Sequence, residues 1–151
     1  MMSAFRSQIV VAAKAHALDA RLLEALVWVE SSDKPDAIRY EFEEYQRLKK
    51  EPPMPYMAFG PLAAHSYGLL QPLYVTCYEQ GFRAEPWKLF VPDINLEWGA
   101  KILADRFVWA KGDRDLAVAS YNVGKGNAKR PFSVIAQAYL SKVYGCLAQL
   151  S

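Results

Sequence analysis

The chain has 151 residues, of which 18 are Lys or Arg and 16 are Asp or Glu, giving a formal charge of +2. This length suits one domain with a sizeable core, and a hydrophobic content of 52% excludes a disordered chain because apolar burial can offset the entropy of ordering. No Lys/Arg stripe indicates a nucleic-acid partner, and no run of about 18 apolar residues indicates membrane insertion.

The N-terminal part of the chain predicts two helices. Residues 4–17 are Ala-rich and amphipathic. Asp19 is a suitable N-cap for a second helix, from Ala20 to about Glu30. The apolar side of the second helix is too broad for a surface helix, so we expect it near the core. That side consists of Leu22, Leu23, Leu26, Val27 and Val29.

Residues 31–71 are the irregular part of the sequence. Charges cluster at 39–51, and Pro52, Pro53 and Pro55 are expected to break any helix there. Large apolar residues recur at every third position between 40 and 50, which fits a short amphipathic helix. A small hairpin is the alternative, and the pattern does not separate the two.

The rest of the sequence predicts helices with recognisable ends. Pro72 suits the first position of a helix that Gly81 closes. The other helices are expected over Pro92–Trp109, from the cap Asp113 to Asn122 with Gly124 ending it, and from the cap Ser133 with Ile135, Tyr139, Val143 and Leu147 facing inward. The expected fold class is mainly α, with about five or six helices around one core and an irregular insert that holds either helix or hairpin.

Cysteine and histidine usage argues against a metal or disulfide scaffold. Cys77 and Cys146 each lie in an apolar helical pattern, which predicts buried free thiols, with a single disulfide as the alternative. His16 and His65 are far apart in sequence, and no Cys/His cluster has metal-ligand spacing. We expect neither a metal nor another cofactor.

Glu30 is the strongest candidate for acid chemistry. It shares a helical face with Leu23, Leu26 and Val27, so its carboxylate is expected to be partly desolvated. The negative end of the helix dipole also disfavours the anion. Both effects raise the pKa of Glu30 toward the value that a general acid needs near neutral pH. A surface Glu at a frayed helix end is the alternative.

Three further motifs are weak individually. The turn Ser66–Pro72 contains a glycine and brings backbone groups close to whatever lies opposite. Asn95 and Gly99 share one helix face, which favours close packing and a buried or capping Asn. Tyr121 and Asn122 precede Gly-x-Gly and present a phenol and an amide suited to a sugar or a carboxylate. Because this Gly-x-Gly follows a helix, it is not a phosphate cradle.

In chain order the motifs resemble those of the soluble lytic transglycosylase (SLT) domain family, which is related to goose-type lysozyme. They are Glu30-Ser31, Gly68-Leu-Leu-Gln71, Asn95-x-x-x-Gly99 and Tyr121-Asn122-Val-Gly124-Lys-Gly126, with Tyr139 as a second tyrosine. The resemblance runs over residues 20–145 and implies that residues 1–151 form one lysozyme-like domain. Its cleft would bind peptidoglycan strands of alternating N-acetylglucosamine and N-acetylmuramic acid.

The resemblance also implies roles for individual residues. Glu30 corresponds to the family's catalytic acid. Tyr121 corresponds to the tyrosine that hydrogen-bonds near that acid, and Asn122 would orient the loop. The family's Gly-Leu-Met-Gln segment lines the cleft, which implies substrate contacts from Gly68, Leu69, Leu70 and Gln71. Leu70 replaces the family's Met with a side chain of similar volume.

The sequence departs from the family pattern between Glu30 and Gly68. Arg39 stands where the family has a Ser that contacts the acetamido group, so Arg39 or Ser66 is the candidate to replace that contact. An insert over residues 37–65 is expected to rebuild one wall of the cleft. Its stretch 37–41 resembles phage and prophage members of the family.

The phage resemblance implies an endolysin or a virion-associated enzyme. Residues 1–18 lack the pattern of a signal peptide, so we expect synthesis in the host cytoplasm and action on the wall after holin-dependent export or carriage in the virion. A monomer is expected.

The one-carboxylate transglycosylase route has two alternatives. A hydrolytic muramidase would need a second carboxylate to activate water. Glu41 is the best candidate, although an ion pair with Arg39 is the simpler interpretation, and Glu43 and Glu44 are expected to form a solvated face. The other alternative is a non-catalytic wall-binding or phage structural module.

Overall fold

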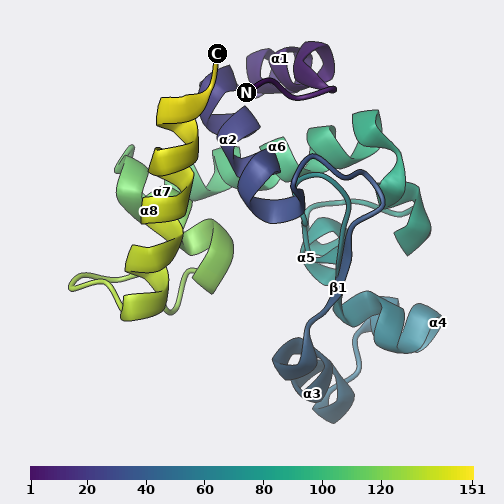
Figure 1. Cartoon of the computed structure of the whole chain (residues 1–151). Coiled ribbons are helices and arrows are strands. Elements are labelled where there is room, and N and C mark those ends of the chain that lie inside the picture. Colours follow the sequence, from purple (N-terminus) through teal and green to yellow (C-terminus); the bar gives the residue numbers. More distant parts are fainter.

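The computed structural model describes residues 1–151 and consists mainly of helices joined to a small antiparallel sheet (Figure 1). The helices are α1 (Arg6–Ala15), α2 (Ala20–Ser31), α3 (Phe42–Lys50), α4 (Met54–Phe59), α5 (Tyr74–Glu79), α6 (Pro92–Trp109), α7 (Arg114–Val123) and α8 (Val134–Gln149). The 3-10 turns are η1 (Gly60–Ala64) and η2 (Pro86–Phe90), and the strands are β1 (Ile38–Tyr40) and β2 (His65–Tyr67). The predicted fold class is confirmed. None of the helices combines the length and apolar character needed to cross a membrane.

The predicted helix caps are present. The Asp19 carboxylate accepts a hydrogen bond from the Arg21 amide, and Asp113 and Ser133 accept from the third residue after each of them. Each cap satisfies a backbone donor that the first helical turn leaves without a partner. The starts of α2, α7 and α8 therefore follow from local chemistry.

The insert contains both structures that its sequence pattern left open. Residues 42–50 form α3, whereas β1 and β2 at the two ends of the insert pair antiparallel, with Ile38 opposite Tyr67 and Tyr40 opposite His65. The expectation that the prolines exclude a helix was wrong for α4. Pro55 lies in its first turn, where a missing backbone N–H costs no helical hydrogen bond.

Other predicted details need correction. Pro72 lies before α5, which begins at Tyr74. Ile135 is 69% exposed because it lies beside, and not on, the inward face of α8 that Ala136, Tyr139, Leu140 and Val143 form at helical spacing. Cys77 and Cys146 are both free, as predicted, but Cys146 is only half-buried.

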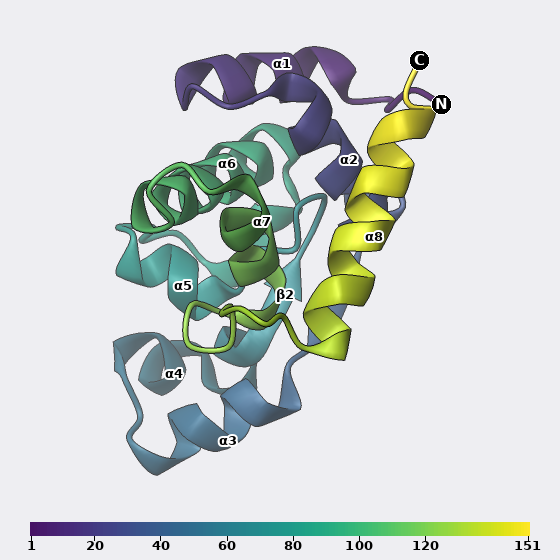
Figure 2. The same cartoon turned by 90° about the vertical axis from the view of Figure 1, so that its left-hand side faces the viewer.

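Two apolar clusters meet at α6. One lies among α1, α2, α6, α7 and α8, and the other packs the insert, α5 and η2 against α6. Leu96 and Leu103 of α6 belong to the first cluster, Ile102 belongs to the second, and Tyr121 packs against both. Figure 2 shows α8 beside α2 and α7, with α1 at one end of the molecule and α3 and α4 at the other.

Gly99 on α6 allows the close approach that its sequence context predicted. A Cβ at this position would lie 2.5 Å from Cδ1 and 2.7 Å from Cβ of Leu70. We expect Gly99→Ala to lower the free energy of unfolding by about 1–3 kcal/mol, because overpacking at Leu70 outweighs the gain in helix propensity. Urea denaturation measures the change.

Gly145 on α8 provides the matched control, because a Cβ there would meet no atom within 4 Å. Gly145→Ala is expected to stabilise the protein by up to about 1 kcal/mol, since only the helix-propensity term remains. Equal effects of the two substitutions would contradict the packing explanation.

Candidate active site

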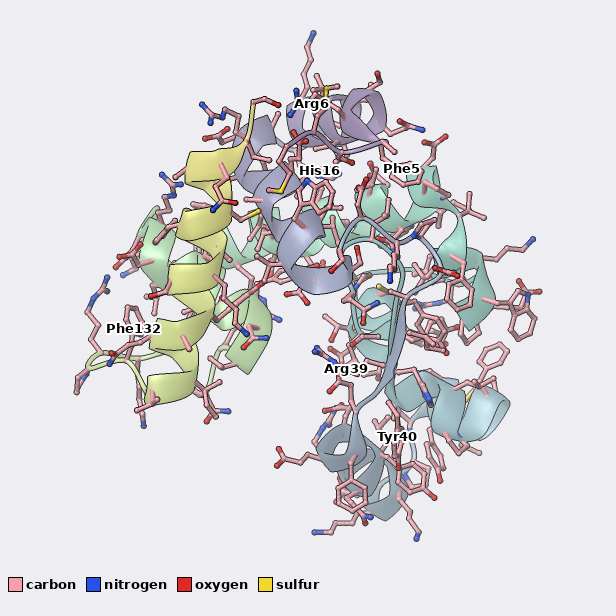
Figure 3. All side chains as sticks on the ribbon, viewed as in Figure 1. Phe5, Arg6, His16, Arg39, Tyr40 and Phe132 are labelled. Atoms are coloured by element: carbon pink, nitrogen blue, oxygen red, sulfur yellow. The ribbon has the colours of Figure 1, made fainter.

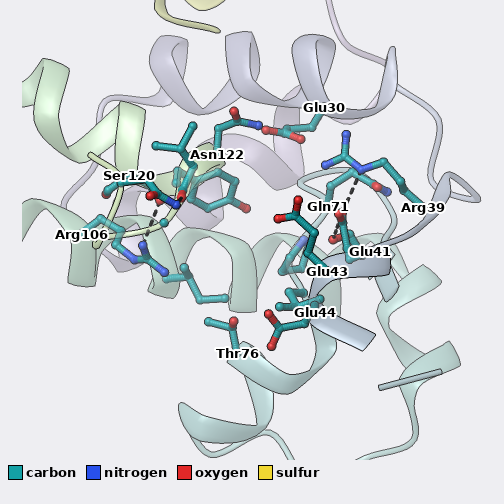
Figure 4. A pocket seen from close by; sticks show the side chains of 18 of the residues that line it. Glu30, Arg39, Glu41, Glu43, Glu44, Gln71, Thr76, Arg106, Ser120 and Asn122 are labelled. Carbon is teal, nitrogen blue, oxygen red and sulfur yellow. Dashed lines mark hydrogen bonds and ion pairs between the residues drawn. The ribbon is translucent and has the colours of Figure 1, made fainter. Parts of the chain in front are cut away.

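A cleft of about 630 Å³ opens between the insert and the helical part of the molecule (Figure 4). Its walls come from the end of α2, from β1 and the first turns of α3, from the segment after β2, and from α6 and α7. The structure brings seven of the predicted site residues together in this lining: Glu30, Arg39, Glu41, Ser66, Gln71, Tyr121 and Asn122.

Glu30 is the next-to-last residue of α2 and faces the cleft. Burial raises the pKa of its carboxyl, as the apolar face of α2 predicts. The hydrogen bond from Tyr139 and the positive charge of Arg39 act in the opposite direction, and the charge of Glu41 adds a smaller upward effect. Burial thus favours the neutral carboxyl of Glu30, whereas Tyr139 and Arg39 favour its anion.

The direct partner of Glu30 is Tyr139 of α8. Its hydroxyl donates to Glu30 Oε1 at 2.5 Å. Tyr121 instead donates to the Leu70 carbonyl at 2.7 Å, so it fixes the backbone beside the cleft. The motif order identifies Tyr139 but assigns it no role. Only the packing of α8 against α2, two helices far apart in sequence, brings its hydroxyl to Glu30.

Arg39, Glu41 and Ser66 form a hydrogen-bonded group on the insert side of the cleft. Arg39 and Ser66 are opposite each other in the β1–β2 ladder. Glu41 Oε1 accepts from Arg39 Nε at 2.8 Å and from Ser66 Oγ at 3.0 Å. The expected ion pair between Arg39 and Glu41 is confirmed. The Arg39 side chain extends from the insert toward the cleft in Figures 3 and 4.

The first turns of α3 bring further charges to the cleft. Glu43 and Glu44, expected on a solvated face, both line it, because the insert turns the start of α3 toward the other wall. Glu44 is paired with Arg47 of the same helix. Sequence reasoning also missed Arg106 of α6, which lines the opposite wall.

Only the last residue of the Gly68–Gln71 segment lines the cleft. Leu69 and Leu70 are 0% exposed and pack in the core, so their side chains do not line the cleft, and the substrate contacts that the resemblance implies for these two residues stay a prediction. Gly68 adopts φ +69° and is also absent from the lining. Gln71 is held in place by hydrogen bonds from its Nε2 to the carbonyls of Ala37 at 3.1 Å and Gly68 at 2.9 Å.

Asn95 of α6 holds the backbone of this segment in place through hydrogen bonds. Its side chain is fully buried and accepts from the Leu70 amide at 2.8 Å. Its Nδ2 donates to the carbonyls of Tyr67 at 2.6 Å and Leu89 at 2.8 Å. One amide therefore satisfies backbone groups from β2, from the Gly68–Gln71 turn and from η2.

Comparisons with known proteins agree with this architecture. The family model described as "Transglycosylase SLT domain" matches residues 7–142. The fold is similar to the X-ray structure of an inactive mutant of lytic transglycosylase Slt from Pseudomonas aeruginosa, with a TM-score of 0.72 and 23% identity over 95% of this chain. This chain spans only 23% of that protein. No protein of curated function matches the sequence.

Proposed function

Because the chain belongs to the transglycosylase SLT domain family, we propose that it is a peptidoglycan lytic transglycosylase. It would cleave the β-1,4 bond between N-acetylmuramic acid and N-acetylglucosamine and leave a 1,6-anhydro end on the muramic acid. The observation that supports this most is the environment of Glu30, a carboxyl with a raised pKa and a tyrosine donor in a cleft of about 630 Å³.

The proposed reaction uses Glu30 twice. Its neutral carboxyl donates a proton to the bridging oxygen as the bond to C1 breaks. The acetamido group of the same sugar stabilises the positive charge at C1. The Glu30 carboxylate then removes the proton of the C6 hydroxyl as that oxygen bonds to C1. The proton balance closes without water, and the Tyr139 hydrogen bond stabilises the intermediate anion.

Hydrolysis with Glu41 as a second carboxylate is the competing proposal, since Glu41 lines the same cleft. A base that activates water needs a free acceptor oxygen within reach of that water. One oxygen of Glu41 already accepts two hydrogen bonds, from Arg39 and from Ser66. These two bonds support a positioning role for Glu41 toward Arg39 and Ser66. Its other oxygen accepts no hydrogen bond from the protein, so the reaction products decide between positioning and base catalysis.

Release of glycan fragments tests the proposed activity. Purified protein is incubated with insoluble peptidoglycan, and soluble fragments are separated and weighed by mass spectrometry. We expect fragments that end in anhydro-muramic acid. Reducing ends would favour the muramidase, and binding without any release would favour a non-catalytic module.

We also propose that the protein is a phage enzyme, an endolysin or a virion-associated enzyme. The support is the resemblance of residues 37–41, at the start of the insert, to phage and prophage members of the family. Expression in bacteria together with a holin is expected to cause lysis, whereas expression with an inactive holin is not. Lysis that is independent of the holin would contradict this export route.

Tyr139→Phe tests the hydrogen bond to Glu30. Because that bond lowers the pKa of Glu30, its removal is expected to raise the pKa further. The alkaline limb of the pH–rate profile, which follows loss of the Glu30 proton, would then move to higher pH. We expect the maximal rate to fall about tenfold, because the carboxylate formed in the first step loses a charge-assisted bond.

Tyr144→Phe is the control for that measurement. The Tyr144 hydroxyl donates to Asp115, and Tyr144 is not part of the cleft lining. Its removal is expected to leave the pH–rate profile unchanged. A Tyr139→Phe profile that moves to lower pH would contradict the assigned role of Tyr139.

A further inference from the structure

The cleft contains one guanidinium without a carboxylate partner. Of the arginines in the lining, Arg39 is paired with Glu41 and Arg47 with Glu44. Arg106 has no ion pair, and its one hydrogen bond runs from a terminal nitrogen to the Ser120 carbonyl at 2.9 Å. Its neighbour Asp105 is paired with Lys125. Arg106 is therefore the arginine of the cleft that makes no ion pair, although the charges of Asp105 and Glu79 favour its charged form from a longer distance.

The position of Arg106 makes this unpaired charge costly. The side chain is half-buried on α6 against α7, and burial lowers its pKa. Removing a charged group from water without an ion-pair partner is unfavourable. A guanidinium has five N–H donors in a fixed fork, and only one hydrogen bond to protein is formed here. The remaining donors suit the two oxygens of a carboxylate.

We propose that Arg106 binds a carboxylate of the peptidoglycan strand during recognition in this cleft. This inference rests on the proposed function, because it takes the wall polymer as the ligand. Two carboxylate sources exist in that polymer: the stem peptide, and the lactyl group where the peptide has been removed. Figure 4 shows Arg106 on the wall formed by α6 and α7, away from Glu30 and across the cleft from α3. The bound carboxylate would thus orient the strand without taking part in bond cleavage.

Arg106→Gln removes the charge and the fork of donors but leaves a polar side chain. Because Gln is shorter than Arg, the contact with the Ser120 carbonyl is also lost, and binding of a neutral ligand measures the effect of that loss. Glu43→Gln is the matched control, because Glu43 lines the same cleft, has no ion pair, and is exposed. Both substitutions are made in the Glu30→Gln protein, so that ligands are bound without being cleaved.

Affinity is measured by calorimetry for three ligands of equal sugar number. These are peptide-bearing glycan fragments, fragments stripped by an amidase so that only lactyl carboxylates remain, and neutral chitooligosaccharides. Arg106→Gln is expected to weaken carboxylate-bearing ligands by about tenfold or more and to leave the neutral ligand unchanged. Weakening of the peptide-bearing ligand alone identifies the stem peptide, and weakening of the stripped ligand identifies the lactyl group. Glu43→Gln is not expected to weaken either.

Other outcomes overturn the proposal. Equal weakening of all three ligands, including the neutral one, would mean that Arg106 only maintains the shape of the cleft. Unchanged affinity for all three would mean that its charge is not used. Failure of the parent protein to bind any wall fragment would instead contradict the proposed function itself.

Discussion

Replacing Glu30 with Gln is expected to reduce the rate of glycan release by roughly 10²–10⁴-fold, the usual contribution of a positioned acid–base group. The substitution keeps the size of the side chain and an oxygen that can accept from Tyr139. It removes the acidic proton, on which both steps of the proposed reaction depend. The rate of release of soluble fragments from insoluble peptidoglycan measures the effect.

Comparing Glu41→Gln with Glu30→Gln shows whether the reaction requires one carboxylate or two. Glu41 lines the same cleft but is bonded to Arg39 and Ser66. Its substitution is expected to cost much less activity than that of Glu30, because it would only loosen the placement of Arg39. A loss as large as that of Glu30→Gln would show that two carboxylates are required and would favour the muramidase.

Glu30→Gln is also expected to make the protein more stable at neutral pH. The pKa of Glu30 is raised in the fold, so the favourable contribution of the neutral acid is present at low pH. That contribution is lost as the pH rises through the folded pKa. The advantage of the Gln variant is therefore expected at pH 7 and should shrink near pH 4. Urea denaturation at both pH values measures it, and a variant less stable than the parent at pH 7 would contradict the burial argument.

Asn95→Ala is expected to have the largest effect on stability, a loss of about 3–5 kcal/mol. It would leave the Leu70 amide and the carbonyls of Tyr67 and Leu89 without their buried partner. Each unsatisfied buried group costs about 1–3 kcal/mol. The free energy of unfolding from denaturant titration gives the loss.

Two further substitutions serve as comparisons for the stability loss of Asn95→Ala. Asn95→Asp can still accept from the Leu70 amide, so it tests the two donated bonds together with the cost of burying a carboxyl against the carbonyls of Tyr67 and Leu89. Asn127→Ala removes an exposed hydrogen bond from the side-chain amide of Asn127 to the Val123 carbonyl. It is expected to cost less than about 1 kcal/mol. A similar small loss for Asn95→Ala would mean that the Asn95 network contributes little to the support of the cleft.

The parts of the fold set by local chemistry could be predicted from the sequence. The caps Asp19, Asp113 and Ser133 fix helix starts through hydrogen bonds within a few residues, and Gly99 anticipates a close contact that the structure shows with Leu70. Glu30 could be identified because its surroundings on α2 are apolar by helical periodicity alone.

The missed features depend on contacts between distant segments. Tyr139 reaches Glu30 only through the packing of α8 against α2. Leu70 lies in the Gly68–Gln71 turn, where its carbonyl accepts a hydrogen bond from Tyr121 beside the cleft while its side chain fills the core. The insert combines a helix with paired strand ends because residues 38–40 find their partner at 65–67, a pairing that no local pattern specifies.

Peptidoglycan digestion in oxygen-18 water tests the central claim most directly. In the proposed reaction the C6 hydroxyl of the substrate replaces water. The products are therefore expected to be one water lighter than hydrolysis products, without incorporated label, and to be absent with Glu30→Gln. Reducing-end products that contain one oxygen-18 atom would contradict the one-carboxylate mechanism and make water the nucleophile.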